Sequence, residues 1–255
     1  ENPSYPYEDC FAPHVDYEDL PGPARKLRAA VDILWSRRVR RQMERLLKRL
    51  RPDVAHMNNI AHQLSPSFLP VLKRYGIPLV MTLRDYKLVC PSYAMVGPDG
   101  VCDRCAGGRY YHCLLRRCTK GSYAKSLVNT LEMYLHHRWM GVYDLIDEFI
   151  SPSRFLAARV KAMGFARRIR WLPNFVEVDR LKPCYESDGR TLVYFGRLSR
   201  EKGLLTLLDA VKGLDVRLRI IGDGPLRGEL ESRVRSRGLR NVCLLGYHSG
   251  AALHE

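Results

Sequence analysis

The sequence contains no run of 18 or more apolar residues, so we expect no transmembrane helix. Its first ten residues, ENPSYPYEDC, have neither a basic start nor an apolar core, so we expect no signal peptide there. They also lack an initiating Met, and we therefore expect further sequence upstream. Short repeats and low-complexity tracts are absent as well, which excludes a repeat array. The composition is that of an ordinary globular protein, with 46% hydrophobic and 27% charged residues.

Acidic residues are few relative to basic ones. The 27 Asp and Glu residues stand against 42 Lys and Arg residues, which gives a formal net charge of +15. The excess is uneven, because residues 1–172 carry 28 basic and 16 acidic side chains, whereas residues 173–255 carry 14 and 11. A basic first half predicts an anionic partner, and a phosphorylated substrate, a nucleic acid and an anionic membrane surface are the alternatives.

Much of the positive charge lies in residues 23–51, where eleven Lys and Arg residues between Arg25 and Arg51 accompany two acids. Apolar residues recur there at helical spacing, which predicts a basic amphipathic helix. Such a helix can lie on anionic lipid. It can equally pack its apolar face inward and leave a basic, solvated back, and the two interpretations are compatible.

Apolar strands alternate with amphipathic helices along the rest of the chain. The expected strands are residues 52–57, 77–83, 148–153, 169–174, 191–195, 216–222 and 241–246, and the expected helices are residues 65–76, 123–141, 153–163, 200–212 and 225–237. This alternation predicts an α/β protein with parallel sheets. We expect a first domain over residues 1–172, a polar linker over 173–190 and a second domain from residue 191, with an irregular Cys-rich insert at 85–122 in the first domain.

Two strand-to-helix turns in the second half have the chemistry of an anion site. In YFGRLSREKGL, Arg197, Arg200 and Lys202 crowd the predicted start of a helix, where each cation costs about 0.3–1 kcal/mol. Either solvent screens these charges and they form a solvated surface cluster, or an anion binds between them. We assign Arg200 to the surface, paired with Glu201. In IIGDGPLRGELE, the turn 222–224 precedes a Pro suited to a first helical position, and its glycines allow close backbone approach to a ligand.

These stretches, followed by NVCLLGYHSG, resemble the retaining glycosyltransferases of family 4 (glycosyl transferases group 1). PDVAHMNN, GIPLVMTLRDYKLVCPSY and FISPSRFLAARV extend the resemblance over nearly the whole chain. It implies a GT-B type fold of two Rossmann-like doubly wound domains, the second of which binds a UDP- or GDP-linked sugar. The residues implied to bind the donor are Arg197, Lys202 and Gly196 at the diphosphate and Gly222, Asp223 and Gly224 in a donor loop. Fixed cations can stabilise the leaving diphosphate, so we expect no cofactor for catalysis.

The sequence departs from the family pattern in two places. In MTLRDYK, Arg84 replaces the usual His of the catalytic region while Asp85 is retained. An Arg cannot carry a proton at neutral pH, but it can bind an anion. The acidic E-x7-E motif would lie after residue 255 and the first glycine-rich loop before residue 1. We therefore expect an internal fragment that is inactive alone.

The Cys-rich stretch holds five of the eight cysteines, and Cys102 and Cys105 form a C-x2-C pair. With Cys90 and either Cys113 or Cys118 they predict a structural zinc site. The alternatives are free thiols and disulfides. The insert also carries the basic residues Arg104, Arg109, Arg116, Arg117 and Lys120. Since the resemblance assigns the acceptor to the first domain, they favour an anionic acceptor such as a lipid diphosphate-linked sugar.

The resulting prediction is a retaining hexosyltransferase that moves a sugar from a nucleotide-diphosphate donor to a saccharide or lipid-linked acceptor in cell-surface polysaccharide synthesis. We expect it in the cytoplasm, peripheral on the inner face of the membrane. One alternative is a zinc-containing nucleic-acid-binding protein, which the basic composition permits. Another is a different GT-B enzyme, such as a nucleotide-sugar epimerase or a phosphorylase.

Overall fold

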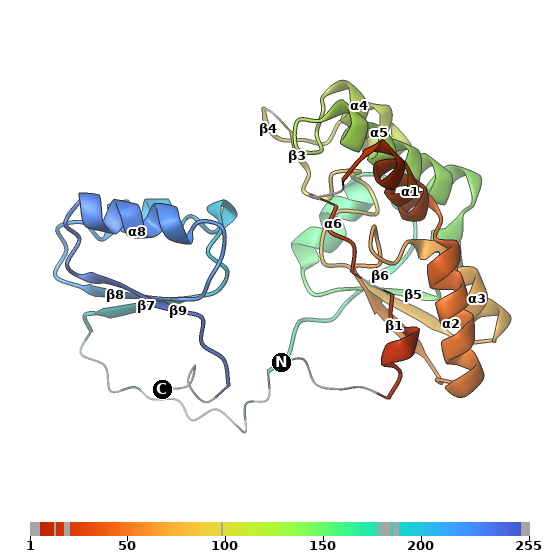
Figure 1. Cartoon of the computed structure of the whole chain (residues 1–255), viewed down its shortest axis with the longest axis horizontal. Helices are drawn as coiled ribbons and strands as arrows, with labels where there is room; N and C mark the ends of the chain where they lie inside the picture. The colour runs from red at the N-terminus through yellow and green to blue at the C-terminus, as the bar shows by residue number, and fades with distance from the viewer. Residues whose placement is uncertain are drawn as a thin grey trace. The chain divides into compact units, whose positions relative to one another are not determined.

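The computed structural model describes residues 6–12, 14–17, 21–97, 99–176, 178, 185 and 189–250. The chain divides into two compact units, residues 1–175 and 176–255, each with its own hydrophobic core (Figure 1). The division lies close to the expected end of the first domain at residue 172. Most of the expected linker lies outside the described residues.

The first unit is built on a parallel four-stranded sheet in the order β1-β2-β5-β6. The strands are β1 Ala55–Asn58, β2 Leu79–Thr82, β5 Glu148–Ser151 and β6 Ile169–Trp171. Each overlaps a segment predicted as a strand. Leu79 and Phe149 are almost fully buried, since both faces of the sheet are covered. The parallel register brings the carboxyl ends of all four strands to one edge, where sites of α/β proteins form.

Serine caps set where three helices of this unit begin. The helices are α2 Arg37–Arg49, α5 Tyr123–Met133 and α6 Arg154–Ala162. In each case the hydroxyl of the preceding serine accepts a hydrogen bond from the backbone N–H three residues on. The helical turn η2 Pro66–Phe68 runs directly into α3 Leu69–Arg74.

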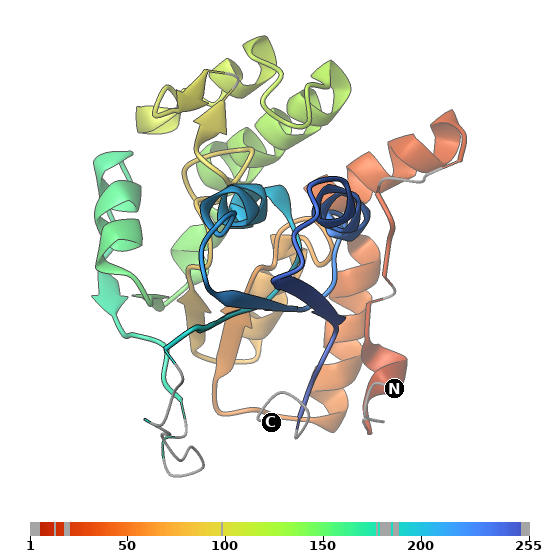
Figure 2. The same ribbon diagram turned by 90° about the vertical axis from the view of Figure 1, so that its left-hand side faces the viewer.

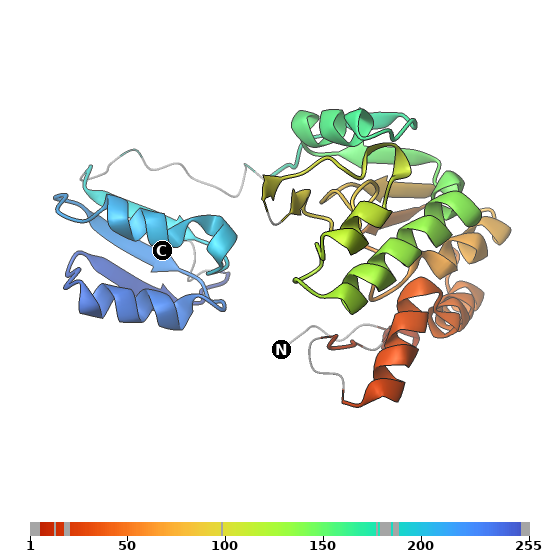
Figure 3. The same cartoon turned by 90° about the horizontal axis from the view of Figure 1, so that it is seen from above.

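The basic segment 23–51 is two helices and not one. The first, α1 Pro23–Leu34, ends at Trp35, and Ser36 then caps α2. Ser36 is buried, and its carbonyl accepts a hydrogen bond from the hydroxyl of Ser67. Hydrophobic spacing alone did not predict the break, because the apolar residues recur on both sides of it and the signal is the capping residue Ser36. The helix α1 packs beside α5 (Figure 3).

Residues 85–122 contain only short elements within the part that the structure describes. They are the antiparallel pair β3 Val96–Gly97 and β4 Gly100–Val101, the turn η3 Ala106–Gly108 and the helix α4 Tyr111–Leu115. After α5 the backbone continues as the π-helix η4 Tyr134–Trp139 and the 3-10 turn η5 Val142–Leu145. The expected regular helix 123–141 therefore changes its hydrogen-bonding pattern after Met133. Another 3-10 turn, η1 Glu8–Cys10, lies near the start of the chain.

The second unit has a parallel three-stranded sheet, β7 Thr191–Phe195, β8 Arg217–Ile221 and β9 Val242–Gly246, in that order. The helices α7 Leu204–Ala210 and α8 Arg227–Ser236 lie on the same side of this sheet, and Figure 2 shows them end-on. Their core consists of leucines and other apolar residues, among them Leu208, Ile220 and Leu230.

Two helix starts of the second unit differ from the prediction. Residues Arg200–Lys202 form the 3-10 turn η7, and the α-helix begins at Leu204, because Gly203 adopts a left-handed conformation between them. The helix α8 begins at Arg227 with Leu226 as its N-cap, so Pro225 lies before the helix and not at its first position.

Candidate functional site

Two loops of the second unit interlock at the carboxyl ends of β7 and β8. The N–H of Gly196 donates to the carbonyl of Ile221 at 3.0 Å, and the N–H of Leu198 donates to that of Asp223 at 2.9 Å. A Cβ atom on Gly222 would lie 1.9 Å from the carbonyl oxygen of Gly196, and one on Gly224 would lie 2.5 Å from that of Leu198. Only glycine fits at position 222 or 224. The close approach that these glycines allow is between the backbones of the two loops, whereas the sequence predicted an approach to a ligand.

Two of the cations beside these loops have no partner among the residues that the structure describes. Arg197 and Lys202 are exposed, and neither side chain forms an ion pair or hydrogen bond within the described residues. Their proximity to Glu201 helps to lower the pKa of that carboxyl, although a hydrogen bond from the Ser199 hydroxyl is the larger cause. Two positively charged side chains that form no ion pair in the described part of the chain therefore lie near Glu201 at this edge of the sheet.

The other charged side chains of this edge are paired. Arg200 binds Glu229, with Nη2 2.7 Å from Oε2, so the expected pairing with Glu201 is wrong. Arg227 contacts the Asp223 carboxylate at 3.2 Å and the Glu231 carboxylate at 2.9 Å. Arg197 and Lys202 also precede the α-helix, which begins at Leu204, so neither cation lies in its first turn and the expected electrostatic cost does not arise. What needs an explanation is that Arg197 and Lys202 have no ion-pair partner among the described residues.

A second candidate site lies in the first unit, where a cavity of about 290 Å³ opens at the carboxyl ends of β1 and β2. Both residues predicted for the catalytic region, Arg84 and Asp85, line it. The Arg84 guanidinium donates from Nε to Asn58 Oδ1 at 3.0 Å and from Nη1 to Asn174 Oδ1 at 3.1 Å. Asp85 Oδ1 accepts a hydrogen bond from the backbone N–H of Lys87 at 2.8 Å.

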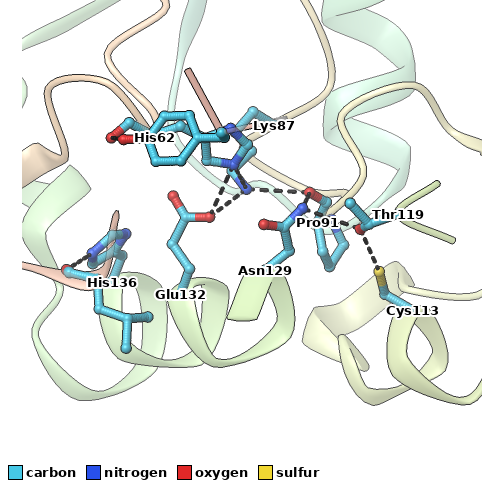
Figure 4. Close-up of polar contacts among 10 residues, drawn as sticks. His62, Lys87, Pro91, Cys113, Thr119, Asn129, Glu132 and His136 are labelled. Carbon is cyan, nitrogen blue, oxygen red and sulfur yellow. Dashed lines mark hydrogen bonds and ion pairs between the residues drawn. The ribbon is translucent and has the colours of Figure 1, made fainter. Parts of the chain in front are cut away.

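A buried charge network beside this cavity was not predicted from the sequence (Figure 4). The Lys87 ammonium lies 2.6 Å from Oε2 of Glu132 and also donates to the carbonyl of Pro91 at 3.2 Å. His62 Nε2 lies 3.5 Å from the same carboxylate oxygen. Burial alone would raise the pKa of Glu132, but the Lys87 and His62 side chains outweigh it and hold the pKa at about 2. Glu132 is thus a fully buried carboxylate that stays ionised.

The backbone around the cavity is strained. Asn59, His62 and Tyr93 line it with φ angles of 43°, 63° and 56°, in the left-handed region that residues with side chains avoid. Such conformations cost about 1–3 kcal/mol each and persist where surrounding contacts impose them. The Lys87–Glu132–His62 network supplies such contacts, because it joins the two strained loops to α5.

The five cysteines of the Cys-rich stretch lie near one another without forming disulfides. All seven cysteines in the described part of the chain are free. Burial, and then the neighbouring Cys90 and Cys113, raise the pKa of the Cys105 thiol to about 12. Within the described residues, no group of three or more His, Cys, Asp or Glu side chains is placed to hold a metal ion. The zinc site therefore stays a prediction, and the arrangement in the structure is that of the free-thiol alternative.

The basic residues of the same stretch are only partly brought together. Arg104, Arg109 and Arg116 line a cavity of about 520 Å³, together with Asp99 and other residues. Arg116 binds the Asp99 carboxylate, which compensates its charge. Arg117 and Lys120 are not among the lining residues, and the Arg117 guanidinium stacks over the Tyr123 ring. This cavity therefore has mixed charge.

Family models match the chain along nearly its whole length. Residues 6–180 match the model described as Glycosyltransferase Family 4, and residues 179–255 match Glycosyl transferases group 1. Among curated proteins, the chain is 30% identical over 132 residues to the lipopolysaccharide core biosynthesis glycosyltransferase LpsD of Rhizobium meliloti, which is 49% of this chain and 38% of that protein. It is 32% identical over 112 residues to the alpha-D-kanosaminyltransferase of Streptomyces kanamyceticus, which is 40% of this chain and 29% of that protein.

Solved structures give weaker matches. The chain aligns with Anabaena Alr3699/HepE in complex with UDP at 17% identity and a TM-score of 0.47, over 83% of this chain and 52% of that one. The apo form of the lipopolysaccharide outer core galactosyltransferase WaaB aligns at 17% identity and a TM-score of 0.43, over 88% and 50%. The chain thus spans about half the length of these structures and less of the curated relatives.

No helix in the described part of the chain is long and apolar enough to cross a membrane. The two parallel α/β units agree with the predicted GT-B type fold, and the family match confirms the resemblance found in the sequence. It also favours glycosyl transfer over the nucleic-acid-binding alternative. The first family model alone covers more than half of the residues, and the chain belongs to glycosyltransferase family 4.

Proposed function

We propose that the chain is part of a retaining hexosyltransferase that moves a sugar from a nucleotide-diphosphate donor to a saccharide or lipid-linked acceptor in cell-surface polysaccharide synthesis. Family membership supports glycosyl transfer, and the relative named for lipopolysaccharide core biosynthesis supports the process. The observation that carries the donor assignment is the unpaired couple Arg197 and Lys202 at the carboxyl end of β7, neither of which has a partner among the described residues.

In this proposal Arg197 and Lys202 bind the donor diphosphate. Negative charge grows on the diphosphate as the sugar leaves, and two fixed cations stabilise it most in the transition state. They supply what a bound metal ion supplies in other transferases. Gly196, Gly222 and Gly224 keep the two loops closely packed beside the cations, and Asp223 holds Arg227 away from the diphosphate through their ion pair.

Acceptor binding belongs to the first unit in this proposal. Asp85 and Arg84 line its cavity, and the Asp85 carboxylate accepts a hydrogen bond from an acceptor hydroxyl. No carboxylate needs to act as a nucleophile, because an acceptor that attacks on the leaving-group side can pass its proton to the departing phosphate. Retention of configuration then follows without a covalent intermediate.

A binding titration with UDP and GDP tests the donor site. We expect one nucleotide to bind the chain and expect Arg197→Ala and Lys202→Ala each to weaken binding about tenfold or more, which corresponds to ~1.4 kcal/mol. Arg200→Ala is the matched control, since it removes a nearby cation that Glu229 already neutralises. Equal affinity in all three variants, or no nucleotide binding by folded protein, contradicts the proposal.

We also propose peripheral contact with an anionic membrane on the cytoplasmic face. Leu27 and Val31 lie one turn apart on α1 and are 68% and 54% exposed, and Tyr123, Leu127 and Leu131 form an exposed row on the neighbouring α5. Of the eleven cations between residues 25 and 51, only Arg49 has an ion-pair partner among the described residues. Exposed apolar side chains beside unpaired cations fit the surface of an anionic bilayer.

A further inference from the structure

We propose that the cavity at the carboxyl ends of β1 and β2 binds a sugar that carries an oxyanion, either a carboxylate or a phosphate, and that the Arg84 guanidinium binds this group. The assignment of this sugar to the acceptor rests on the proposed function. The binding site itself rests on the geometry of Arg84 and of the cavity walls.

Arg84 is held in place by uncharged groups. Asn58 ends β1 and Asn174 lies beyond β6, and their amide oxygens accept from Nε and Nη1 across the edge of the sheet. Arg74 and Arg170 of the same unit bind the carboxylates of Glu44 and Glu148 instead. The two hydrogen-bond partners of Arg84 therefore bring no negative charge to its guanidinium.

One side of the guanidinium is left for a ligand. The Nη2 group of Arg84 donates to no acceptor in the part of the chain that the structure describes. The two asparagines restrict the rotation of the side chain, so less conformational entropy is lost when an anion binds. A planar guanidinium fixed in this way suits the oxygens of a carboxylate or phosphate.

The remaining walls suit the ring and hydroxyl groups of a sugar. Asp85 Oδ2 has no hydrogen-bond partner among the described residues, so it is available to accept from a hydroxyl. The Tyr93 ring is 47% exposed and offers an apolar face. The volume of about 290 Å³ lies just below the usual range of about 300–1,000 Å³ for ligand sites, which suits one sugar ring better than a nucleotide.

Lys87 also lines this cavity but is not available as the binding cation. Its ammonium is buried and lies 2.6 Å from the Glu132 carboxylate, which neutralises it. Its part is to hold the loops in the strained conformation that shapes the wall. His62 belongs to the same network, and its ring faces both the Lys87 ammonium and the Glu132 carboxylate. This leaves Arg84 as the uncompensated cation among the residues that line the cavity.

Calorimetric titration of the chain with glucuronic acid, glucose 6-phosphate and glucose tests the inference. We expect at least one acidic sugar to bind about tenfold more tightly than glucose, and the better of the two identifies the oxyanion. Arg84→Gln should remove the difference, and Arg84→Lys should keep part of it. Arg74→Gln is the matched control, because it removes an exposed arginine of the same unit that is already paired.

The inference is overturned if glucose binds as tightly as both acidic sugars, if no acidic sugar binds, or if Arg84→Gln keeps the preference. Circular dichroism and thermal unfolding of each variant show whether it is folded. The nucleotide titration separates this inference from the proposed function. Nucleotide binding without acidic-sugar binding leaves the donor site standing, and the reverse result leaves the acidic-sugar site standing.

Discussion

At the scale of single residues, the most deeply buried ion pair among the described residues of the first unit is that of Lys87 and Glu132. Its Nζ–Oε2 distance is 2.6 Å, and the carboxylate has no exposed surface. A buried ion pair is weak support for stability as such, since removing two charges from water costs about as much as their attraction returns. Removing one partner is different, because the other charge is then left buried and unpaired.

Glu132→Gln should lower the free energy of unfolding by about 3–5 kcal/mol, because Lys87 would remain buried without its counter-charge. The double variant, Glu132→Leu with Lys87→Met, should recover most of this loss, because it removes both charges and leaves apolar side chains in their place. Urea unfolding at neutral pH measures both effects. The control is Glu44→Gln, which breaks the exposed pair with Arg74 and should cost under about 1 kcal/mol. Equal losses in Glu132→Gln and Glu44→Gln would contradict this account.

The same carboxylate predicts how stability depends on acid. Its pKa is about 2 in the folded chain, below the ordinary value of 4.5. The unfolded state therefore takes up the proton first as pH falls, and the stabilisation present above pH 4.5 is lost between pH 4.5 and 2, by roughly 3 kcal/mol. Unfolding measured across that interval should show a smaller slope in Glu132→Gln. An unchanged slope would mean that other carboxyl groups cause the acid dependence.

How well a residue could be predicted depended on how local its chemistry was. Arg197 and Lys202 could be proposed from the sequence because the motif that contains them spans only a few positions. Lys87 and Glu132 are 45 residues apart, and nothing in either neighbourhood indicates the other. A signal existed, since Glu132 lies within a largely apolar stretch and Lys87 directly precedes one, but only the fold identifies the partner of each charge. The bracing of Arg84 by Asn174, 90 residues away, was hidden for the same reason.

At the scale of elements, strands were predicted more securely than helix ends. Each expected strand overlaps an observed one, because short apolar runs bounded by polar turns mark strands whether one face or both faces are buried. The helices differ where one residue overrides the hydrophobic pattern: Ser36 caps α2 inside a continuous amphipathic stretch, and Gly203 separates η7 from α7. Capping and left-handed residues carry that information, whereas periodicity does not.

The Cys-rich element gives a test of the zinc prediction. If the site forms, chain purified in the presence of zinc should hold about one equivalent of metal, measured by mass spectrometry. Cys102→Ser and Cys105→Ser should each lose it, while Cys243→Ser, in the second unit, should retain it. Lack of metal in the unmodified chain, with its thiols reactive after unfolding, would instead support the free-thiol alternative that matches the arrangement in the structure.

At the scale of the whole molecule, the net charge of +15 is concentrated where the fold leaves it unpaired. The cations of α1 and α2 mostly lack carboxylate partners among the described residues, whereas Arg227 and Arg233 of α8 and Arg237 just after it are paired with acids of the second unit. Surface charge that a fold does not neutralise attracts an anionic partner, and screening by salt weakens that attraction.

The chain should therefore sediment with vesicles that contain anionic phosphatidylglycerol and not with neutral phosphatidylcholine vesicles. Leu27→Glu with Val31→Glu should weaken this binding about tenfold, because it removes apolar contact and adds negative charge on α1. Leu214→Glu is the matched control, since Leu214 is similarly exposed, at 55%, but belongs to the second unit. If added salt weakens binding of the unmodified chain and the α1 variant binds equally well, then charge alone causes the contact and the apolar side chains of α1 take no part in it. Equal binding to neutral vesicles would exclude the charged surface as its cause.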